Sequence, residues 1–189
     1  ASFNLNGERI ACDISPCNMA LNTITSWIGV EFDNHGTLAA KGKVNEELLE
    51  RLNAIKYYSS PPPKSLGKEW FMRQFLPEIR RTKLTIEDAL CTVNEHIADQ
   101  VSGFVNQFDF TGSKMLVTGG GTYNKHLIEQ IKNKCRVELF IPDEKLIDFK
   151  EAIVFAYLGL LRVRNEINVL ASVTGAESDT SAGIINHPN

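Results

Sequence analysis

The chain has 189 residues, of which 43% are hydrophobic, and its 20 Lys+Arg and 23 Asp+Glu give a formal net charge of -3. A chain of this length buries roughly 70% of the surface that its unfolded form exposes, so a core needs no disulfide or structural metal. The charge excludes a strongly basic, nucleic-acid-binding profile, and the short apolar runs exclude a membrane-spanning helix. We therefore predict one globular domain over residues 1–189.

The four cysteines indicate free thiols. Cys12, Cys17, Cys91 and Cys135 form no C-x-x-C pair and have no His cluster beside them. This scattered spacing is typical of buried thiols in a reducing compartment and not of a zinc site. We predict a cytoplasmic protein without a metal site, with neither nucleic acid nor a membrane as its partner.

The first elements predicted along the chain are a hairpin and a helix. Asn6 and Gly7 separate two short strand-like runs, at 3–5 and 8–12, and supply the positive φ that a tight hairpin turn requires. From residue 16 onward apolar residues recur at helical intervals, and a proline at this position suits the first turn of a helix. Asp13 therefore lies where a strand passes into a helix.

Capping residues and prolines mark the middle of the chain. Asn45 is predicted to cap a short helix, and the three prolines at 61–63 to form a rigid, extended spacer. A second short amphipathic helix is expected around residues 70–75. Thr85 and Asp88 resemble a capping box, and they open the longest predicted helix.

The second half of the chain alternates strands and helices. A strand is predicted at 114–118, followed by three glycines at 119–121 and a helix, and a second strand at 137–141 precedes the apolar helix 149–163. Such alternation is typical of helices packed over a sheet with parallel pairing. We predict the fold class α/β, with the apolar helix buried and a loop from residue 171 to the end.

Asp13 is the first candidate functional residue. An acid at the carboxyl end of a strand points into the crevice where ligands bind in open α/β sheets, and a helix start beside it favours a phosphate. Its carboxylate can coordinate Mg²⁺ through water or accept a proton from an attacking hydroxyl or water. Aspartate is also a common helix cap, and on position alone capping is the favoured role.

The glycine turn is the second candidate. Gly119, Gly120 and Gly121 lack Cβ atoms, so their backbone can approach a nucleotide closely and expose N–H groups at the next helix. Their spacing matches neither G-x-G-x-x-G nor the P-loop, and a plain turn between strand and helix is the favoured alternative. Asn124 either hydrogen-bonds a ligand or caps that helix.

Other polar residues give weaker signals. Segment 61–69 holds two Lys, a Ser and a Glu behind the proline spacer, which suits a ligand-presenting loop as well as a solvated surface connection. Glu151 lies at the edge of the apolar helix, beside charged residues that indicate a solvated helix start. The four histidines are dispersed without metal-binding spacing, so we assign no function to them.

Six segments in chain order carry a family resemblance. They are 12–19 (CDISPCNM), 33–42 (DNHGTLAAKG), 61–69 (PPPKSLGKE), 117–124 (VTGGGTYN), 151–156 (EAIVFA) and 172–176 (SVTGA). Together they resemble the C-terminal half of a 1,6-anhydro-N-acetylmuramic acid kinase. Six motifs in the same order over almost the whole chain are far more specific than any one of them.

The resemblance implies a fold and an activity that composition and spacing do not show. The fold is a ribonuclease-H-like domain of the actin, hexokinase and heat-shock-chaperone superfamily, with a mixed sheet and helices on both faces. The activity is that of a kinase that uses ATP and Mg²⁺ to open the anhydro amino sugar with water and to phosphorylate its O6, in peptidoglycan recycling. The family also implies a homodimer.

The resemblance also implies roles for individual residues. Asp13 matches the catalytic acid that activates the attacking water, and Asn18 matches the substrate-binding Asn that closes the same motif. The glycines at 119–121 and Asn124 match the nucleotide-binding segment, and Glu151 matches a sugar contact. A further family segment, to which we assign no role, consists of Lys64, Ser65, Gly67 and Glu69.

The chain departs from the family in two places. The usual acid motif reads Asp-Thr-Gly-Pro-Gly-Asn, whereas Ile14, Ser15 and Cys17 stand here for Thr, Gly and Gly. Side chains at glycine positions restrict how closely a phosphate approaches the backbone. The family's N-terminal Gly-Thr-Ser-x-Asp-Gly phosphate loop is not in this sequence. We therefore expect the C-terminal half of a two-domain kinase, folded but inactive without the N-terminal domain.

Two hypotheses about function stay open at this point. In the first, the full-length parent is an amino-sugar kinase with Asp13 as its base. In the second, the altered acid motif marks a non-catalytic relative that binds a nucleotide or a sugar, and Asp13 is only a cap. The exact sugar and the effect of the altered motif on catalysis do not follow from the sequence.

Overall fold

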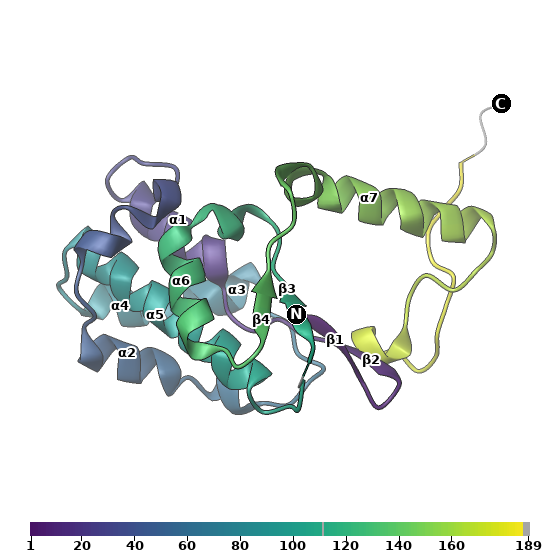
Figure 1. Ribbon diagram of the computed structural model, residues 1–189, viewed down its shortest axis with the longest axis horizontal. Coiled ribbons are helices and arrows are strands. Elements are labelled where there is room, and N and C mark those ends of the chain that lie inside the picture. The colour runs from purple at the N-terminus through teal and green to yellow at the C-terminus, as the bar shows by residue number, and fades with distance from the viewer. Residues whose placement is uncertain (111, 187–189) are drawn as a thin grey trace. The chain divides into compact units, whose positions relative to one another are not determined.

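A computed structural model describes residues 1–110 and 112–186 of the chain (Figure 1). These residues group into two compact units, each of which is described by itself. Unit 1 consists of residues 1–13, 61–65 and 144–186, and unit 2 of residues 14–60, 66–110 and 112–143. The predicted single domain 1–189 stays a prediction, and its last three residues lie outside the described part.

Unit 1 begins with the predicted hairpin. Strands β1 (Ser2–Leu5) and β2 (Glu8–Ala11) pair antiparallel, with Leu5 opposite Glu8. Asn6 and Gly7 form the turn with φ values of 51° and 86°. These are the left-handed conformations that an Asn-Gly hairpin turn requires, so the predicted hairpin is confirmed.

Unit 1 ends with two helices, α7 (Glu144–Val163) and the short α8 (Ala171–Thr174), which packs on β2. The predicted buried helix is wrong, because Ile147 is the one buried residue of α7 and the Phe155 side chain is 71% exposed. A two-stranded hairpin offers too little apolar surface to cover a helix of 20 residues. The prediction of loop throughout from residue 171 is also wrong, because α8 interrupts it.

In the described residues no helix has both the length and the apolar character needed to cross a membrane.

Unit 2 is mostly helical (Figure 1). Its helices are α1 (Cys17–Ser26), α2 (Glu46–Asn53), α3 (Lys68–Trp70), α4 (Leu76–Arg81), α5 (Ile86–Val105) and α6 (Lys125–Lys134). A π-helical stretch, η4 (Phe71–Phe75), joins α3 to α4, and the shorter 3-10 helices are η1 (Asn34–Gly36), η2 (Ala39–Lys41), η3 (Lys56–Ser59) and η5 (Gly120–Tyr123). Helix α5 is the centre of the unit, in contact with α1, α2 and α6.

Two of the predicted helix caps are confirmed. Asn45 Oδ1 accepts a hydrogen bond of 2.9 Å from the Leu48 N–H at the start of α2. Thr85 Oγ1 accepts one of 3.1 Å from the Asp88 N–H at the start of α5. These caps satisfy N–H groups that have no partner within the helix, which is why polar residues precede both apolar runs.

The apolar stripes of these helices meet in one core. Its fully buried members include the large side chains Phe71, Phe75, Ile24, Leu48, Leu52, Leu90 and Ile97. Burial of each such side chain contributes about 2 kcal/mol to folding relative to leaving it in water. The stripe predicted for α1 is only partly correct, because Met19 and Trp27 are exposed while Leu21 and Ile24 are buried.

The strands of unit 2 pair as the alternating pattern predicts. Strands β3 (Lys114–Leu116) and β4 (Glu138–Phe140) are parallel, with Lys114 opposite Glu138, and α6 lies between them in the chain. The observed class is therefore mixed α/β, mostly helical, with two small two-stranded sheets. The larger ribonuclease-H-like mixed sheet that the resemblance implies is not seen among the described residues, because the hairpin and the parallel pair form separate sheets.

Candidate substrate and nucleotide site

The glycine turn follows β3 and leads through η5 into α6. Gly119 has φ +86°, a left-handed conformation that glycine adopts without strain. Thr122 closes the turn, because its Oγ1 donates a hydrogen bond of 2.7 Å to the Gly119 carbonyl oxygen. The turn therefore lies at the carboxyl end of a parallel strand, where ligands bind in open α/β folds.

Asn18 lies against this turn. A Cβ atom added to Gly121 would lie 3.3 Å from Asn18 Oδ1, and one added to Gly120 would lie 3.5 Å from Asn18 Nδ2. Glycine at these positions thus lets the first turn of α1 approach the backbone closely. The structure brings together residues that the sequence placed in separate roles, Asn18 as a substrate contact and the glycines as a nucleotide segment.

The start of α1 carries no side-chain cap among the described residues. Pro16, which has no N–H, occupies the cap position, and its carbonyl oxygen accepts the first helical hydrogen bond, 3.0 Å from the Ala20 nitrogen. Asp13 is therefore not the N-cap of this helix. A helix start without a competing side-chain acceptor suits an incoming phosphate.

Asn124 acts as a helix cap. Its Oδ1 accepts a hydrogen bond of 3.0 Å from the Leu127 N–H at the start of α6. Its Nδ2 donates one of 3.1 Å to Asn94 Oδ1 on α5, and both side chains are buried. The structure thus shows the capping role, whereas the nucleotide contact by Asn124 stays a prediction.

Residues 33–36 pack against the end of the glycine turn and the start of α6. Both Asp33 carboxylate oxygens accept backbone hydrogen bonds, 2.8 Å from Leu38 N and 2.9 Å from Ala39 N. A Cβ added to Gly36 would lie 2.2 Å from Asn124 Oδ1, so only glycine fits there. The neighbouring His35 Nδ1 lies 3.1 Å from the Tyr123 carbonyl oxygen and donates to it. Segment 33–42 therefore packs against segment 117–124, which contains the glycine turn.

A buried hydroxyl without a partner lies directly before the glycine turn. Thr118 Oγ1 makes no hydrogen bond to any described residue although it is inaccessible to solvent. Buried polar atoms are nearly always paired with protein or ordered water. An orphan hydroxyl at this position is an observation consistent with a ligand or bound water at the turn.

Asp13 belongs to unit 1. Its side chain is exposed, and its backbone N–H donates a hydrogen bond of 3.0 Å to the Lys64 carbonyl oxygen. This backbone hydrogen bond joins segment 61–69, at Lys64, to segment 12–19, at Asp13. In the same unit, a Cβ added to Gly175 would lie 3.7 Å from Pro63 Cγ, so the last resembling segment lies beside the prolines.

Burial and charge shift two pKa values beside Asp13. Burial raises the pKa of the Cys12 thiol, against the opposing effect of the N-terminal amine and Lys64. Burial also lowers the pKa of Lys64, and Cys12 counters that shift only in its thiolate form. The Cys12 thiol is therefore protonated at neutral pH and is a structural, not a nucleophilic, group.

Glu151 lies on α7 of unit 1 with an exposed side chain. The sugar contact expected of it is untested and stays a prediction. Asn18 and the glycines belong to unit 2, where the structure brings them together, whereas Asp13 and Glu151 belong to unit 1.

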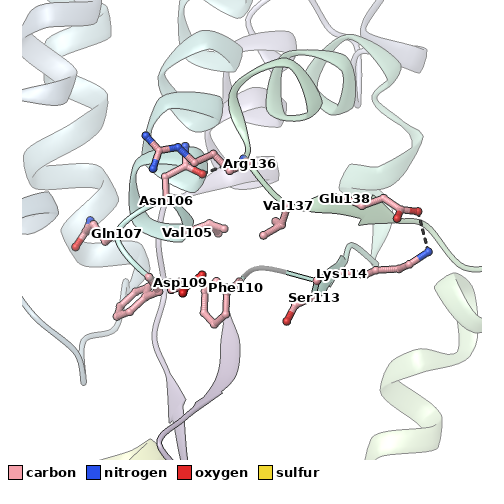
Figure 2. A pocket seen from close by; sticks show the side chains of 12 residues that line it. Val105, Asn106, Gln107, Asp109, Phe110, Ser113, Lys114, Arg136, Val137 and Glu138 are labelled. Carbon is pink, nitrogen blue, oxygen red and sulfur yellow. Dashed lines mark hydrogen bonds and ion pairs between the residues drawn. The ribbon is translucent and has the colours of Figure 1, made fainter.

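A pocket of about 620 Å³ lies at the opposite end of the parallel strands (Figure 2). It is lined by the loop after α5 and by the first residues of β3 and β4, which an ion pair of 2.8 Å joins between Lys114 and Glu138. Asn106 holds the rim by accepting from the Arg136 N–H at 3.0 Å. None of the predicted site residues is among the described residues that line it. Because ligands bind beyond the carboxyl ends of parallel strands, this pocket is not the candidate site.

The site offers no dedicated metal cage. In the described part of the chain, no group of three or more His, Cys, Asp or Glu is arranged to hold a metal ion. Mg²⁺ in kinases is held mainly by nucleotide phosphates, water and one or two carboxylates, so such a cage is not required.

A buried polar network around α5 was not found from the sequence. His96, on α5, is fully buried, with Nδ1 2.6 Å from Asn53 Oδ1 and Nε2 2.9 Å from the Tyr58 hydroxyl oxygen. Burial lowers the pKa of His96 to about 3, although the charge of Asp99 opposes the shift. Burial also raises the pKa of Tyr58 well above its usual range. The sequence did contain a signal for this network, because the polar residues Asn94 and His96 interrupt the apolar stripe of the longest predicted helix.

Comparison with known proteins gives one family. A family model described as anhydro-N-acetylmuramic acid kinase matches residues 2–188. Proteins of that name from Caldanaerobacter subterraneus subsp. tengcongensis and Coxiella burnetii are each 30% identical over 94% of the chain, and one from Clostridioides difficile is 33% identical over 94%. The chain spans about half the length of these curated relatives, 48% of the first and 49% of the other two.

Proposed function

The chain belongs to the anhydro-N-acetylmuramic acid kinase family, and on that basis we propose that it is part of an ATP-dependent amino-sugar kinase. The proposed enzyme opens 1,6-anhydro-N-acetylmuramic acid with water and phosphorylates O6, in peptidoglycan recycling in the cytoplasm. The observation that carries the proposal is the family match over residues 2–188, which includes every predicted site residue.

In the proposed reaction, the Asp13 carboxylate accepts a proton from the water that attacks the anomeric carbon. The bond between that carbon and O6 breaks, and O6 attacks the γ-phosphorus of ATP, so that ADP leaves. The exposed Asp13 side chain supports this role, because a general base must reach solvent or substrate. So does Pro16 at the cap position of α1, since it leaves Asp13 without the alternative capping role.

The nucleotide is proposed to bind at the glycine turn of unit 2. The left-handed Gly119, the approach of Asn18 to Gly121 and the orphan Thr118 hydroxyl support this assignment. Mg²⁺, held by the nucleotide phosphates, would offset charge on the transferred group. Glu151 is proposed as a sugar contact on unit 1.

The proposal extends to the whole protein. Because the chain spans about half the length of its relatives, we propose that it is the C-terminal, ribonuclease-H-like half of a two-domain kinase. Domain 1–189 then lacks the N-terminal phosphate loop and is inactive alone. A homodimer is part of the same proposal.

The test is ADP release by the full-length protein given ATP, Mg²⁺ and 1,6-anhydro-N-acetylmuramic acid, with Asp13→Asn alongside. Sugar-dependent release that is lost in the variant supports the kinase. A folded parent that binds sugar or ATP without releasing ADP contradicts it and supports a non-catalytic relative with a degenerate acid motif. The matched control is Asp143→Asn, which exchanges an acid outside all six resembling segments and is expected to keep wild-type turnover.

A further inference from the structure

One face of helix α7 carries apolar residues in a heptad pattern. Spacings of three and four residues alternate along this face, which holds Leu146, Phe149, Ile153, Ala156, Leu160 and Val163. Residues with this spacing line up along one side of a helix and form the surface by which helices pack against a partner. We call these six residues the α7 seam.

The α7 seam is exposed along its whole length. Its five larger side chains are between 38% and 67% exposed, and Ala156 between them is exposed as well. Single apolar residues at a surface are common, whereas a continuous row of large ones marks an interaction surface.

The other side of α7 is covered by unit 1 itself. Arg162 Nε donates a hydrogen bond of 2.8 Å to the Gly183 carbonyl oxygen, and a Cβ added to Gly183 would lie 3.6 Å from Arg162 Cγ. On the same side of the helix, Ile147 is buried and Leu158 is half-buried. The chain that follows α7 therefore folds back over this side and leaves the α7 seam uncovered.

The relatives have enough additional chain to cover the seam. The chain spans only 48% of one curated relative and 49% of two others, so about as many residues again are present in each of them. The family match over residues 2–188 includes the whole of α7. A helix that is apolar over more of its surface than its own unit buries is typical of the core of a larger structure.

The charges beside the seam disfavour a second copy of α7 as its partner. The flanking positions of the heptad pattern hold Lys145, Lys150 and Arg164, and no Asp or Glu. Two copies therefore have no opposite charges to pair across the seam, and a parallel pair would place Lys145 of one copy beside Lys150 of the other. Like charges at these positions destabilise a helix pair. A complementary partner has an apolar surface bordered by acidic side chains.

We propose that the α7 seam is the docking surface for the half of the parent protein that the relatives have and this chain lacks, and that this half presents an apolar surface bordered by acidic residues. The inference rests on the proposed function, which makes the chain one half of a two-domain kinase. The proposed homodimer would then use a different surface.

The first test is photo-cross-linking in the full-length protein. Phe149→p-benzoylphenylalanine and Leu160→p-benzoylphenylalanine each place a photoreactive ketone in the seam, and mass spectrometry identifies the cross-linked peptides. Both variants are expected to cross-link within one copy to peptides outside residues 1–189. The matched control places the same group at Asp148, an exposed position of α7 outside the seam, and is expected to give no such cross-link.

The second test reverses a flanking charge. Lys150→Glu in the full-length protein is expected to speed amide hydrogen exchange of α7 about two- to fivefold, because it places an acid against the acidic border. Lys132→Glu reverses an exposed lysine of α6 and is expected to leave the exchange of α7 unchanged.

Three cross-linking results would overturn the inference: cross-links between two copies, cross-links to residues 14–143 of the same copy, or none from either seam position. Unchanged exchange in Lys150→Glu would overturn the acidic border. If one seam variant does not fold, the other carries the test. Failure of the proposed function is distinguishable, because the wild-type protein would then release no ADP while the seam still cross-links outside residues 1–189.

Discussion

The backbone N–H of Asp13 donates a hydrogen bond of 3.0 Å to the carbonyl oxygen of Lys64. This bond joins the acid segment to the proline-rich segment, and it does not use the Asp13 carboxylate. The backbone therefore helps to fix the position of the acid, and Asp13 is an exposed residue.

From this we predict that Asp13→Asn keeps the fold. The free energy of unfolding, measured by urea denaturation of the full-length protein, should change by less than about 1 kcal/mol, as for an exposed polar exchange. A larger loss would show that the carboxylate has a structural role instead of the proposed catalytic one.

Gly36→Ala should destabilise the protein strongly. The new Cβ would meet Asn124 Oδ1 at 2.2 Å and His126 Cβ at 2.7 Å, at a φ of +73°. Backbone strain and the clash together should cost about 3 kcal/mol or more in unfolding free energy. The matched control is Gly29→Ala, which has the same φ of +73° and nothing within 4 Å, so it should cost only about 1 kcal/mol. Equal losses would contradict the close packing of Gly36 on Asn124.

Asn124→Ala should lower stability through two lost hydrogen bonds. The change removes the cap on α6 and leaves buried Asn94 Oδ1 unpaired, for a loss of about 2–4 kcal/mol in thermal or chemical unfolding. Asn124→Ser keeps a capping oxygen and should recover about 1 kcal/mol. Unchanged stability combined with lost nucleotide binding would instead identify Asn124 as a ligand contact.

His96 should make stability depend on pH. Its folded-state pKa, about 3, lies below the ordinary value of 6.5, so the unfolded state binds more protons between these values. The contribution is complete above pH 6.5 and is lost as the pH falls toward 3, with a slope of up to about 1.4 kcal/mol per pH unit. His96→Gln should flatten this slope in urea titrations at pH 4 to 7, whereas the exposed His35→Gln should not. A slope that persists in His96→Gln would exclude His96 as its source.

Gly121→Ala should weaken nucleotide binding with little loss of stability. The added Cβ would lie 3.3 Å from Asn18 Oδ1 and 3.8 Å from Cys17 Sγ, so the α1 start must shift by a few tenths of an ångström. Because Gly121 is not in a left-handed conformation, the backbone itself is not strained. We expect about a tenfold higher Kd for an ATP analogue, with thermal unfolding nearly unchanged. Wild-type affinity in this variant would argue against the glycine turn as the nucleotide site.

Local patterns were sufficient for the elements that depend on near neighbours in the chain. The Asn6-Gly7 turn and the Asn45 and Thr85 caps were predicted correctly, because each depends on backbone conformation or hydrogen bonds within a few residues. The parallel strand pair followed from the alternation of strand and helix, which leaves few connections available. The apolar helix α7 was misjudged, because hydrophobicity predicts a preference for burial and not the surface that supplies it.

The sequence by itself determined the family, the candidate acid Asp13 and the glycine turn, because these are matters of residue type, order and spacing. Only the tertiary structure decided that Asn18 rests on Gly121, that Asn124 caps α6 beneath Gly36, and that the Tyr58 hydroxyl bonds to buried His96. These contacts join residues far apart in the chain. Their partners are chosen by packing across α1, α5 and α6, which no local pattern encodes.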